Sequence, residues 1–226
     1  GNGIAFFSER SGSRQLWFYQ DEKLEQLSNI SVNSSINYFV WSANGKQLAA
    51  LSDGQILLFD KKGFTQRVKP NFKVTKLFQW TTDNKILLRV IDDKGISLAL
   101  YDLASSSLVK LYDEDVHWAQ FSQGLVLITD RKNNIKQVDN GQLVSYEPLT
   151  SQTTKTRFFV RDRNLFLLGI NGTFWRHNLD TLENEALFHY PNLTVKLSDV
   201  SSDANSLLVS KFISAKKEIV LLSNPE

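Results

Sequence analysis

The sequence predicts an all-β fold made of about six repeated four-stranded units, and three observations predict it. Aromatic or branched apolar anchor residues recur at intervals of about 40 residues, at Trp41, Trp80, Phe121, Val160 and Val200. Between the anchors, short apolar runs rich in Val, Ile, Leu, Phe and Tyr alternate with turns rich in Gly, Asn, Asp and Ser, which is typical of β-strands. No stretch shows the capped periodicity of an amphipathic helix.

Four strands in each unit of about 40 residues are typical of a β-propeller blade. We therefore expect a single propeller domain, with blades at residues 1–31, 32–69, 70–113, 114–149, 150–190 and 191–226. Six blades of four antiparallel strands fit best, although five or seven stay open. We expect the ring to close by face packing between the first and last blades, because their partial strand sets cannot merge into one four-stranded blade.

The end blades are expected to be incomplete. The first has apolar runs at 4–9, 15–20 and 23–28, which match the second, third and fourth strands of a unit, so its innermost strand is missing. The last has runs at 196–202, 206–212 and 218–224, which match the first three strands, so its outermost strand is missing.

The middle blades share a polar turn between their first and second strands. Ser42 and Gly45 fill this turn in one unit and Thr81 and Asn84 in the next. The hydroxyl can bond a nearby backbone N–H, and Gly or Asn tolerates a positive φ. We interpret the anchor aromatics Trp41, Trp80 and Phe121 as packing between neighbouring blades.

Composition excludes several classes of function. The chain has 226 residues, 42% of them hydrophobic, with 26 basic and 24 acidic residues and a net charge of +2. Such a balance predicts no nucleic-acid contact by these residues. Without cysteine there are no disulfides and no thiolate sites. Without methionine, the chain is expected to be a piece of a longer protein or a processed one. No apolar run approaches the ~18 residues of a membrane span.

Motifs for catalysis and cofactor binding are absent from the sequence. It contains no G-x-S-x-G elbow, no H-E-x-x-H pair and no phosphate-binding glycine loop, so we expect no enzyme activity, no cofactor and no metal. His117, His177 and His189 are expected at the surface or at strand ends. The acidic runs 92–93 and 113–115 lack the spacing of a calcium loop and are interpreted as solvated turns.

A binding site is predicted at the rim of the central channel. Four residues before each anchor, at the start of the innermost strand, the residue is always polar: Asn37, Lys76, His117, Thr156 and Lys196. Longer loops on the same face add mixed charge suited to a protein, peptide or small-molecule partner. A solvated strand start would also explain polar residues there.

The first unit carries the most specific motif. An apolar strand ends in S-x-R-x-G, a Leu-Trp pair follows, and the last strand closes with Leu-Ser. These positions are Ser8, Arg10, Gly12, Leu16, Trp17, Leu27 and Ser28. The next unit carries W-S-A-N-G-K at 41–46, in which Ala43 and Asn44 replace the Pro and Asp of W-S-P-D-G-K. The chain resembles the TolB-like, WD-type (PD-repeat) β-propellers over essentially its whole length.

This resemblance implies a binding role in the bacterial periplasm. Membrane-bound winged-helix transcriptional regulators similar to CadC and ToxR place a sensor domain outside the membrane, and some relatives carry such propellers there. The chain is therefore expected to be a non-catalytic, periplasmic signal-sensing domain of a membrane-anchored regulator. The alternatives are the substrate-gating propeller of a prolyl or dipeptidyl peptidase and a free-standing TolB-like periplasmic scaffold.

Overall fold

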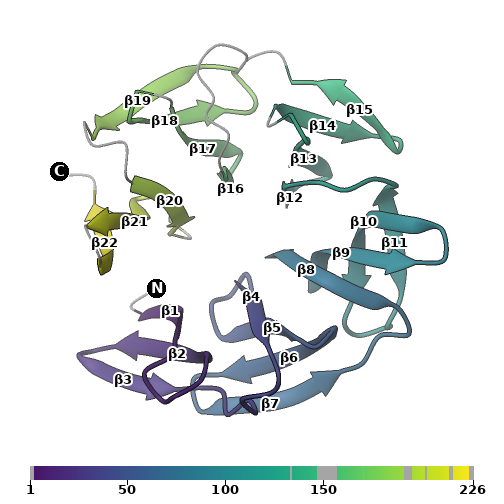
Figure 1. Cartoon of the computed structure of the whole chain (residues 1–226). Helices are drawn as coiled ribbons and strands as arrows, with labels where there is room; N and C mark the ends of the chain where they lie inside the picture. Colours follow the sequence, from purple (N-terminus) through teal and green to yellow (C-terminus); the bar gives the residue numbers. More distant parts are fainter. Residues whose placement is uncertain are drawn as a thin grey trace. The chain divides into compact units, whose positions relative to one another are not determined.

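The computed structural model describes residues 3–132, 134–146, 157–169, 171–190, 195–201, 203–213 and 216–223. In these ranges the chain forms 22 strands and no helix (Figure 1). Accordingly, no helix of the described chain has the length and apolarity needed to cross a membrane. The all-β prediction is confirmed.

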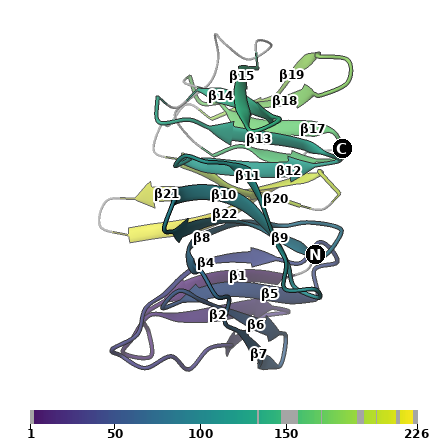
Figure 2. The same cartoon turned by 90° about the vertical axis from the view of Figure 1, so that its right-hand side faces the viewer.

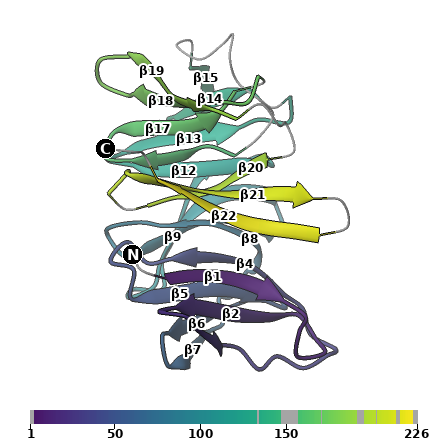
Figure 3. The ribbon, with the colours of Figure 1, turned by 90° about the vertical axis from the view of Figure 1, so that its left-hand side faces the viewer.

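The strands form six antiparallel sheets, each a meander in which consecutive strands pair. The first sheet contains β1 (Gly3–Ser8) and β2 (Gln15–Gln20) (Figure 3), and β3 (Lys23–Gln26) (Figure 1). The second contains β4 (Ile36–Trp41), β5 (Gln47–Ser52), β6 (Gln55–Asp60) and β7 (Gly63–Val68). The third contains β8 (Lys73–Trp80), β9 (Lys85–Asp92), β10 (Gly95–Asp102) and β11 (Leu108–Tyr112) (Figure 2).

The other three sheets follow in chain order. The fourth contains β12 (Trp118–Ser122), β13 (Leu125–Thr129), β14 (Ile135–Asp139) and β15 (Gln142–Ser145). The fifth contains β16 (Phe159–Arg161), β17 (Asn164–Leu168), β18 (Thr173–Asn178) and β19 (Asn184–His189). The sixth contains β20 (Val195–Val200), β21 (Ser206–Ile213) and β22 (Lys216–Ser223).

This arrangement is five blade-like sheets of mostly four strands plus a partial sheet. The first and last sheets have three strands each in the described chain, as expected from the partial units at the two ends. The strand expected at 15–20 is β2 itself. Each sheet falls inside one of the ranges expected for the blades.

Internal contacts divide the chain into two compact units, Gly1–Asp115 and Val116–Glu226. The first unit contains the first three sheets and the second unit the other three. Each unit is described separately below. The single-domain interpretation stays a prediction.

Two apolar clusters hold the first unit together. One joins the first and second sheets through residues such as Leu16, Phe18 and Phe59, with Trp41 packed against it. The other joins the second and third sheets and includes Trp80. The interpretation of Trp41 and Trp80 as packing between neighbouring sheets is confirmed.

The polar turn between the first and second strands adopts the same conformation in two sheets of the first unit. In the second sheet, the Ser42 hydroxyl accepts a hydrogen bond from the Gln47 N–H (2.9 Å), and Gly45 has a φ of 65°. In the third sheet, Thr81 Oγ1 accepts from the Lys85 N–H (3.1 Å), and Asn84 has a φ of 61°. Both hydroxyl roles and both positive φ values agree with the turn chemistry expected from the sequence.

The second unit is joined by polar contacts as well as apolar packing. The Trp118 indole Nε1 donates to the Phe158 carbonyl oxygen (2.6 Å), and its ring meets the Phe159 ring edge-on with centroids 5.6 Å apart. Arg161 on β16 pairs with Asp199 on β20 at 2.9 Å between Nη2 and Oδ1. These contacts link the fourth, fifth and sixth sheets in sequence.

Candidate functional site

The structure places the polar residues predicted to line the channel rim on or beside the first strands. Asn37 lies on β4, Lys76 on β8 and Lys196 on β20, while His117 immediately precedes β12. Thr156 lies outside the described residues. Asn37 and Lys76 belong to the first unit and His117 and Lys196 to the second. That these five residues line one rim stays a prediction.

In the first unit, Lys76 meets a neighbour that sequence reasoning missed. Its ammonium nitrogen lies 5.7 Å from the centroid of the Tyr38 ring and 4.9 Å from that of Phe78. A cation this close to an aromatic ring face is attracted to it. Because Tyr38 lies on β4, the contact joins the first strands of two adjacent sheets and places Lys76 beside the residue that follows Asn37.

Tyr38 is exposed by a bulge. The register between β4 and β5 shifts between Asn37 and Phe39, so Tyr38 lacks a partner on β5. Its φ is 48°, a conformation that is strained for a bulky side chain. The bulge turns the ring outward, leaving it 38% exposed. The one feature of the sequence that could have indicated Tyr38 as a candidate site residue is its position next to Asn37, a predicted rim residue.

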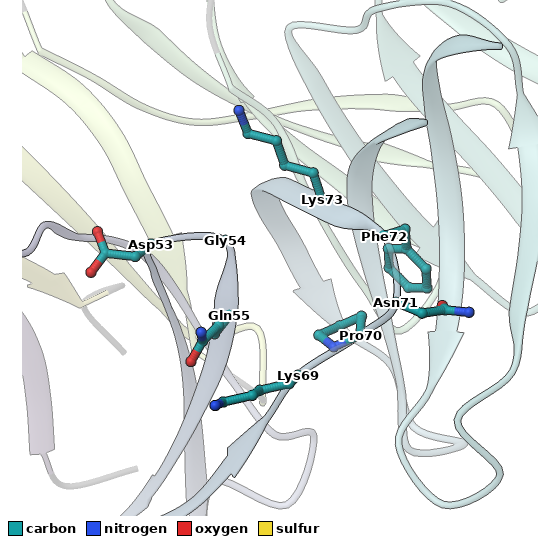
Figure 4. A pocket seen from close by; sticks show the side chains of 8 residues that line it. All are labelled: Asp53, Gly54, Gln55, Lys69, Pro70, Asn71, Phe72 and Lys73. Carbon is teal, nitrogen blue, oxygen red and sulfur yellow. The ribbon is translucent and has the colours of Figure 1, made fainter. Parts of the chain in front are cut away.

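The first unit also has an open groove, which was not foreseen. It consists of two adjacent pockets on either side of the β5–β6 turn, of about 570 Å³ and about 190 Å³, which share Asp53 and Gln55. The larger pocket is lined by Asp53, Gly54, Gln55, Lys69, Pro70, Asn71, Phe72 and Lys73 (Figure 4). The smaller one adds residues of the β3–β4 connection, from Asn29 to Ser34, together with Arg67 of β7. We call these two pockets together the groove.

The chain builds the groove from a tight turn and two connections between sheets. Asp53 and Gly54 both have positive φ, as a type I′ hairpin turn requires, and Asp-Gly is a favoured sequence for it. A Cβ on Gly54 would lie 3.8 Å from the Val74 carbonyl oxygen, which places the turn against β8. The turn between the second and third strands of this sheet therefore lies beside the connection to the next sheet.

The carboxylate of Asp53 is occupied within the protein. It accepts hydrogen bonds from the backbone N–H (3.2 Å) and the hydroxyl (3.4 Å) of Ser35. A hydrogen bond from the Ser34 side chain is the main cause that lowers the pKa of Asp53, and the charge of Arg67 lowers it further. Asp53 therefore stays ionised and ties the turn to the β3–β4 connection.

The second unit contains a buried histidine, which corrects one expectation. His177 lies one residue before the end of β18, but it is fully buried, with 0% exposure, and is not a surface residue. Its Nδ1 lies 3.0 Å from Asn184 Oδ1 and its Nε2 lies 2.9 Å from the Tyr146 hydroxyl. Because Oδ1 can only accept, Nδ1 carries the proton and Nε2 accepts from Tyr146. Burial lowers the pKa of His177 and raises that of Tyr146. His117 and His189 are exposed, as expected.

Three acids of the runs 92–93 and 113–115 have partners within the protein, whereas Asp93 and Glu114 are exposed, as expected for solvated turns. Asp115 pairs with Arg89 at 2.7 Å, Asp92 pairs with Lys110 at 2.7 Å, and Asp113 accepts from the Ser97 hydroxyl at 2.9 Å. These acids hold the ends of neighbouring strands together. Among the described residues, no three His, Asp or Glu side chains gather as metal ligands.

Arg10 of the sequence motif has a structural role. Its guanidinium carbon lies 5.1 Å from the Trp17 ring centroid and 5.6 Å from that of Phe6, and its Nε donates to the Ser8 hydroxyl (3.2 Å). Arg10 therefore contacts two other residues of the motif, Ser8 and Trp17.

Solved structures, in contrast to sequence comparisons, show clear similarity. No protein-family model matches the chain, and no curated protein is significantly similar to it. TolB from Acinetobacter baumannii superposes with a TM-score of 0.67 and 15% identity, over 99% of this chain and 61% of the TolB chain. The fold is a β-propeller.

Two further solved structures superpose over nearly the whole chain. The β-propeller domain of Cps50 (Swd1) from Myceliophteria thermophila has a TM-score of 0.59 and 13% identity, over 100% of this chain and 83% of that one. An oligogalacturonate lyase in complex with manganese has a TM-score of 0.61 and 12% identity, over 98% and 71%. At such low identity the likeness establishes the propeller fold alone. This propeller spans about three fifths of the TolB chain.

Proposed function

We propose that this propeller is a non-catalytic binding domain whose ligand or protein partner contacts the ends of the first strands. The observation that carries the proposal is the pair formed by Lys76 and Tyr38. A strained, outward-turned aromatic ring and a cation from the adjacent strand are a combination that binding sites use, since such strain persists where it serves recognition. The predicted rim residues Asn37, His117, Thr156 and Lys196 remain further candidates for ligand contacts.

We further propose a six-bladed ring in which the first and last sheets are incomplete blades. The support is the repeat of about 40 residues, with one sheet in each of the six expected ranges.

In the parent protein, the proposed role is that of a periplasmic signal-sensing domain of a membrane-anchored transcriptional regulator similar to CadC and ToxR. The TolB-like fold and the S-x-R-x-G and W-S-x-N-G-K motifs support a periplasmic setting. A free-standing TolB-like scaffold is the second candidate, because TolB itself is among the similar structures.

The parent gene distinguishes the two candidates. A winged-helix domain and one apolar span upstream of the propeller support the regulator. A signal peptide followed by an additional N-terminal domain supports the scaffold.

Thermal-shift measurements with a panel of peptides and small molecules test the binding site. A ligand near saturation should raise the melting temperature of the wild-type protein by about 5 °C or more. The triple variant Lys76→Ala, His117→Ala, Lys196→Ala should lose this shift. The site is refuted if the variant keeps the full shift, and the binding role is refuted if no member of the panel stabilises the wild type.

A matched control carries the same three kinds of substitution elsewhere. Lys46→Ala, Lys62→Ala and His189→Ala remove two exposed lysines and one exposed histidine outside the proposed site. This variant should retain the wild-type shift.

A further inference from the structure

The groove beside the β5–β6 turn carries positive charge that the protein does not neutralise. In the described part of the chain, neither Lys69 nor Lys73 forms an ion pair, and both are exposed. In Figure 4 the side chain of Lys69, in the β7–β8 connection, extends toward Gln55, and that of Lys73, the first residue of β8, extends past Gly54 on the other side of the turn. The two lysines therefore present a pair of cations to anything in the groove.

The one acidic group in the groove does not offset these cations. The Asp53 carboxylate is held by hydrogen bonds from Ser34 and Ser35, and Ser34 and the nearby Arg67 line the smaller pocket. In Figure 4 its carboxylate points away from Phe72 and Pro70. The larger pocket is therefore electrostatically suited to carboxylates.

An apolar surface lies between the two lysines in sequence. Pro70 and Phe72 are half-buried, and the Phe72 ring packs edge-on against Tyr101 with centroids 5.5 Å apart. Proline restricts the backbone and the Tyr101 contact holds the ring, so this surface is already formed before a ligand binds. An apolar side chain of a ligand can pack there while neighbouring carboxylates reach the lysines.

The shape of the groove favours a segment of another protein over a small molecule. A small-molecule site encloses most of its ligand, whereas the larger pocket here lies open to solvent and continues past the turn into the smaller one. An extended chain can cross the turn and contact both pockets, with Gln55 between them able to hydrogen-bond its backbone.

We infer that this groove is a docking site for an acidic peptide segment of a partner protein, with carboxylates at Lys69 and Lys73 and an apolar side chain on Pro70 and Phe72. This site shares no residue with the Tyr38–Lys76 pair. It can therefore be tested independently of the proposed ligand site.

Fluorescence anisotropy with a labelled synthetic peptide of alternating Glu and Leu, blocked at both ends, tests the inference. The full chain should bind this peptide, and binding should weaken as NaCl rises from about 50 to about 500 mM. A peptide with Gln in place of every Glu should not bind. The double variant Lys69→Glu, Lys73→Glu should weaken binding at least about tenfold, because two attractions become repulsions.

The double variant Lys46→Glu, Lys62→Glu is the matched control. It makes the same change in net charge, on exposed lysines in the β4–β5 and β6–β7 turns, which lie at the opposite ends of the strands from the β5–β6 turn. This variant should bind the peptide with an affinity within about twofold of the wild type. Thermal melts of both variants show whether they fold as the wild type does.

Three results would overturn the inference. The first is no binding of the Glu-containing peptide by the wild type. The second is an equal loss of affinity in both double variants, which would indicate an effect of net charge alone. The third is full displacement of the peptide by inorganic phosphate at comparable concentration, which would indicate a simple anion site. If the triple variant Lys76→Ala, His117→Ala, Lys196→Ala keeps its full thermal shift while the Glu-containing peptide still binds the wild type, only the proposed ligand site is refuted.

Discussion

Two buried threonines show how differently one residue type can contribute. Thr81 Oγ1 accepts from the Lys85 N–H and donates to the Asp83 carboxylate (2.5 Å), closing the turn between β8 and β9. Thr129 Oγ1 on β13 has no hydrogen-bond partner among the described residues. Burying a hydroxyl without a hydrogen-bond partner destabilises the folded state, because the hydroxyl loses its hydrogen bonds to water. A buried hydroxyl with partners stabilises the folded state.

We therefore expect opposite results from the same substitution at the two positions. Thr81→Val should lower the free energy of unfolding by about 2 kcal/mol, because Lys85 N–H and Asp83 lose a partner. Thr129→Val should leave it unchanged or raise it slightly. Urea denaturation of both variants measures this difference. A larger loss for Thr129→Val would contradict the assignment of its hydroxyl as unpaired.

His177 is expected to make stability depend on pH. Burial lowers its pKa in the folded state below the ordinary value of about 6.5. The unfolded chain then binds a proton that the folded chain excludes, so stability is present above about pH 6.5 and falls as the pH drops below it. Protonation of His177 would also place a hydrogen on Nε2, which in the neutral ring accepts the hydrogen bond from the Tyr146 hydroxyl.

The measurement compares urea midpoints at about pH 7.5 and about pH 5.5, on either side of the ordinary histidine pKa. His177→Gln should lose less stability between these pH values than the wild type does. His189→Gln changes an exposed histidine and should keep the wild-type pH dependence. If the urea midpoints of all three proteins change equally between the two pH values, His177 does not cause the pH dependence.

At the scale of the element, β6 shows how one strand holds two sheets. Phe59 on β6 is 1% exposed and belongs to the cluster that joins the first and second sheets. Phe64 on β7 contacts Phe59 at 5.9 Å between centroids, yet it is 54% exposed. Burial, and not contact alone, decides the contribution of each ring.

Phe59→Ala should lower the free energy of unfolding by about 3–5 kcal/mol through the cavity it leaves. Phe64→Ala removes the same atoms at the surface and should cost about 1 kcal/mol. Denaturation followed by tryptophan fluorescence measures both, since Trp41 packs against the same cluster. Equal losses would mean that Phe59 is not part of a closely packed core.

Much of the strand pattern could be predicted from the sequence, because it depends on residues that are close together in the chain. Alternating apolar residues and turns such as Ser42–Gly45 specify a strand and its end within a few residues. The bulge at Tyr38 could not be predicted, because the residues around it, Asn37 and Phe39, have the pattern of an uninterrupted strand. Nothing local indicates that the pairing with β5 skips a residue.

At the scale of the whole molecule, the near-balance of 26 basic and 24 acidic residues conceals a local imbalance. In the described part of the chain, six acids form ion pairs, among them Asp115 with Arg89 and Asp199 with Arg161. The lysines of the groove lie apart from them. Net charge gives no reason to expect nucleic-acid binding, which stays a prediction, and it could not reveal the local excess of lysine on which the proposed docking site rests.

The sequence by itself determined the repeat of strands, the range of the chain in which each sheet lies, the three-stranded first and last sheets and the turn chemistry. These follow from residues close together in the chain. Only the tertiary structure decided the pairing of Lys76 with Tyr38, the burial of His177 and the groove between the Asp53 turn and Lys69–Lys73. Each of these joins residues of different strands or sheets, and their proximity depends on pairing register and packing that a repeat pattern does not specify.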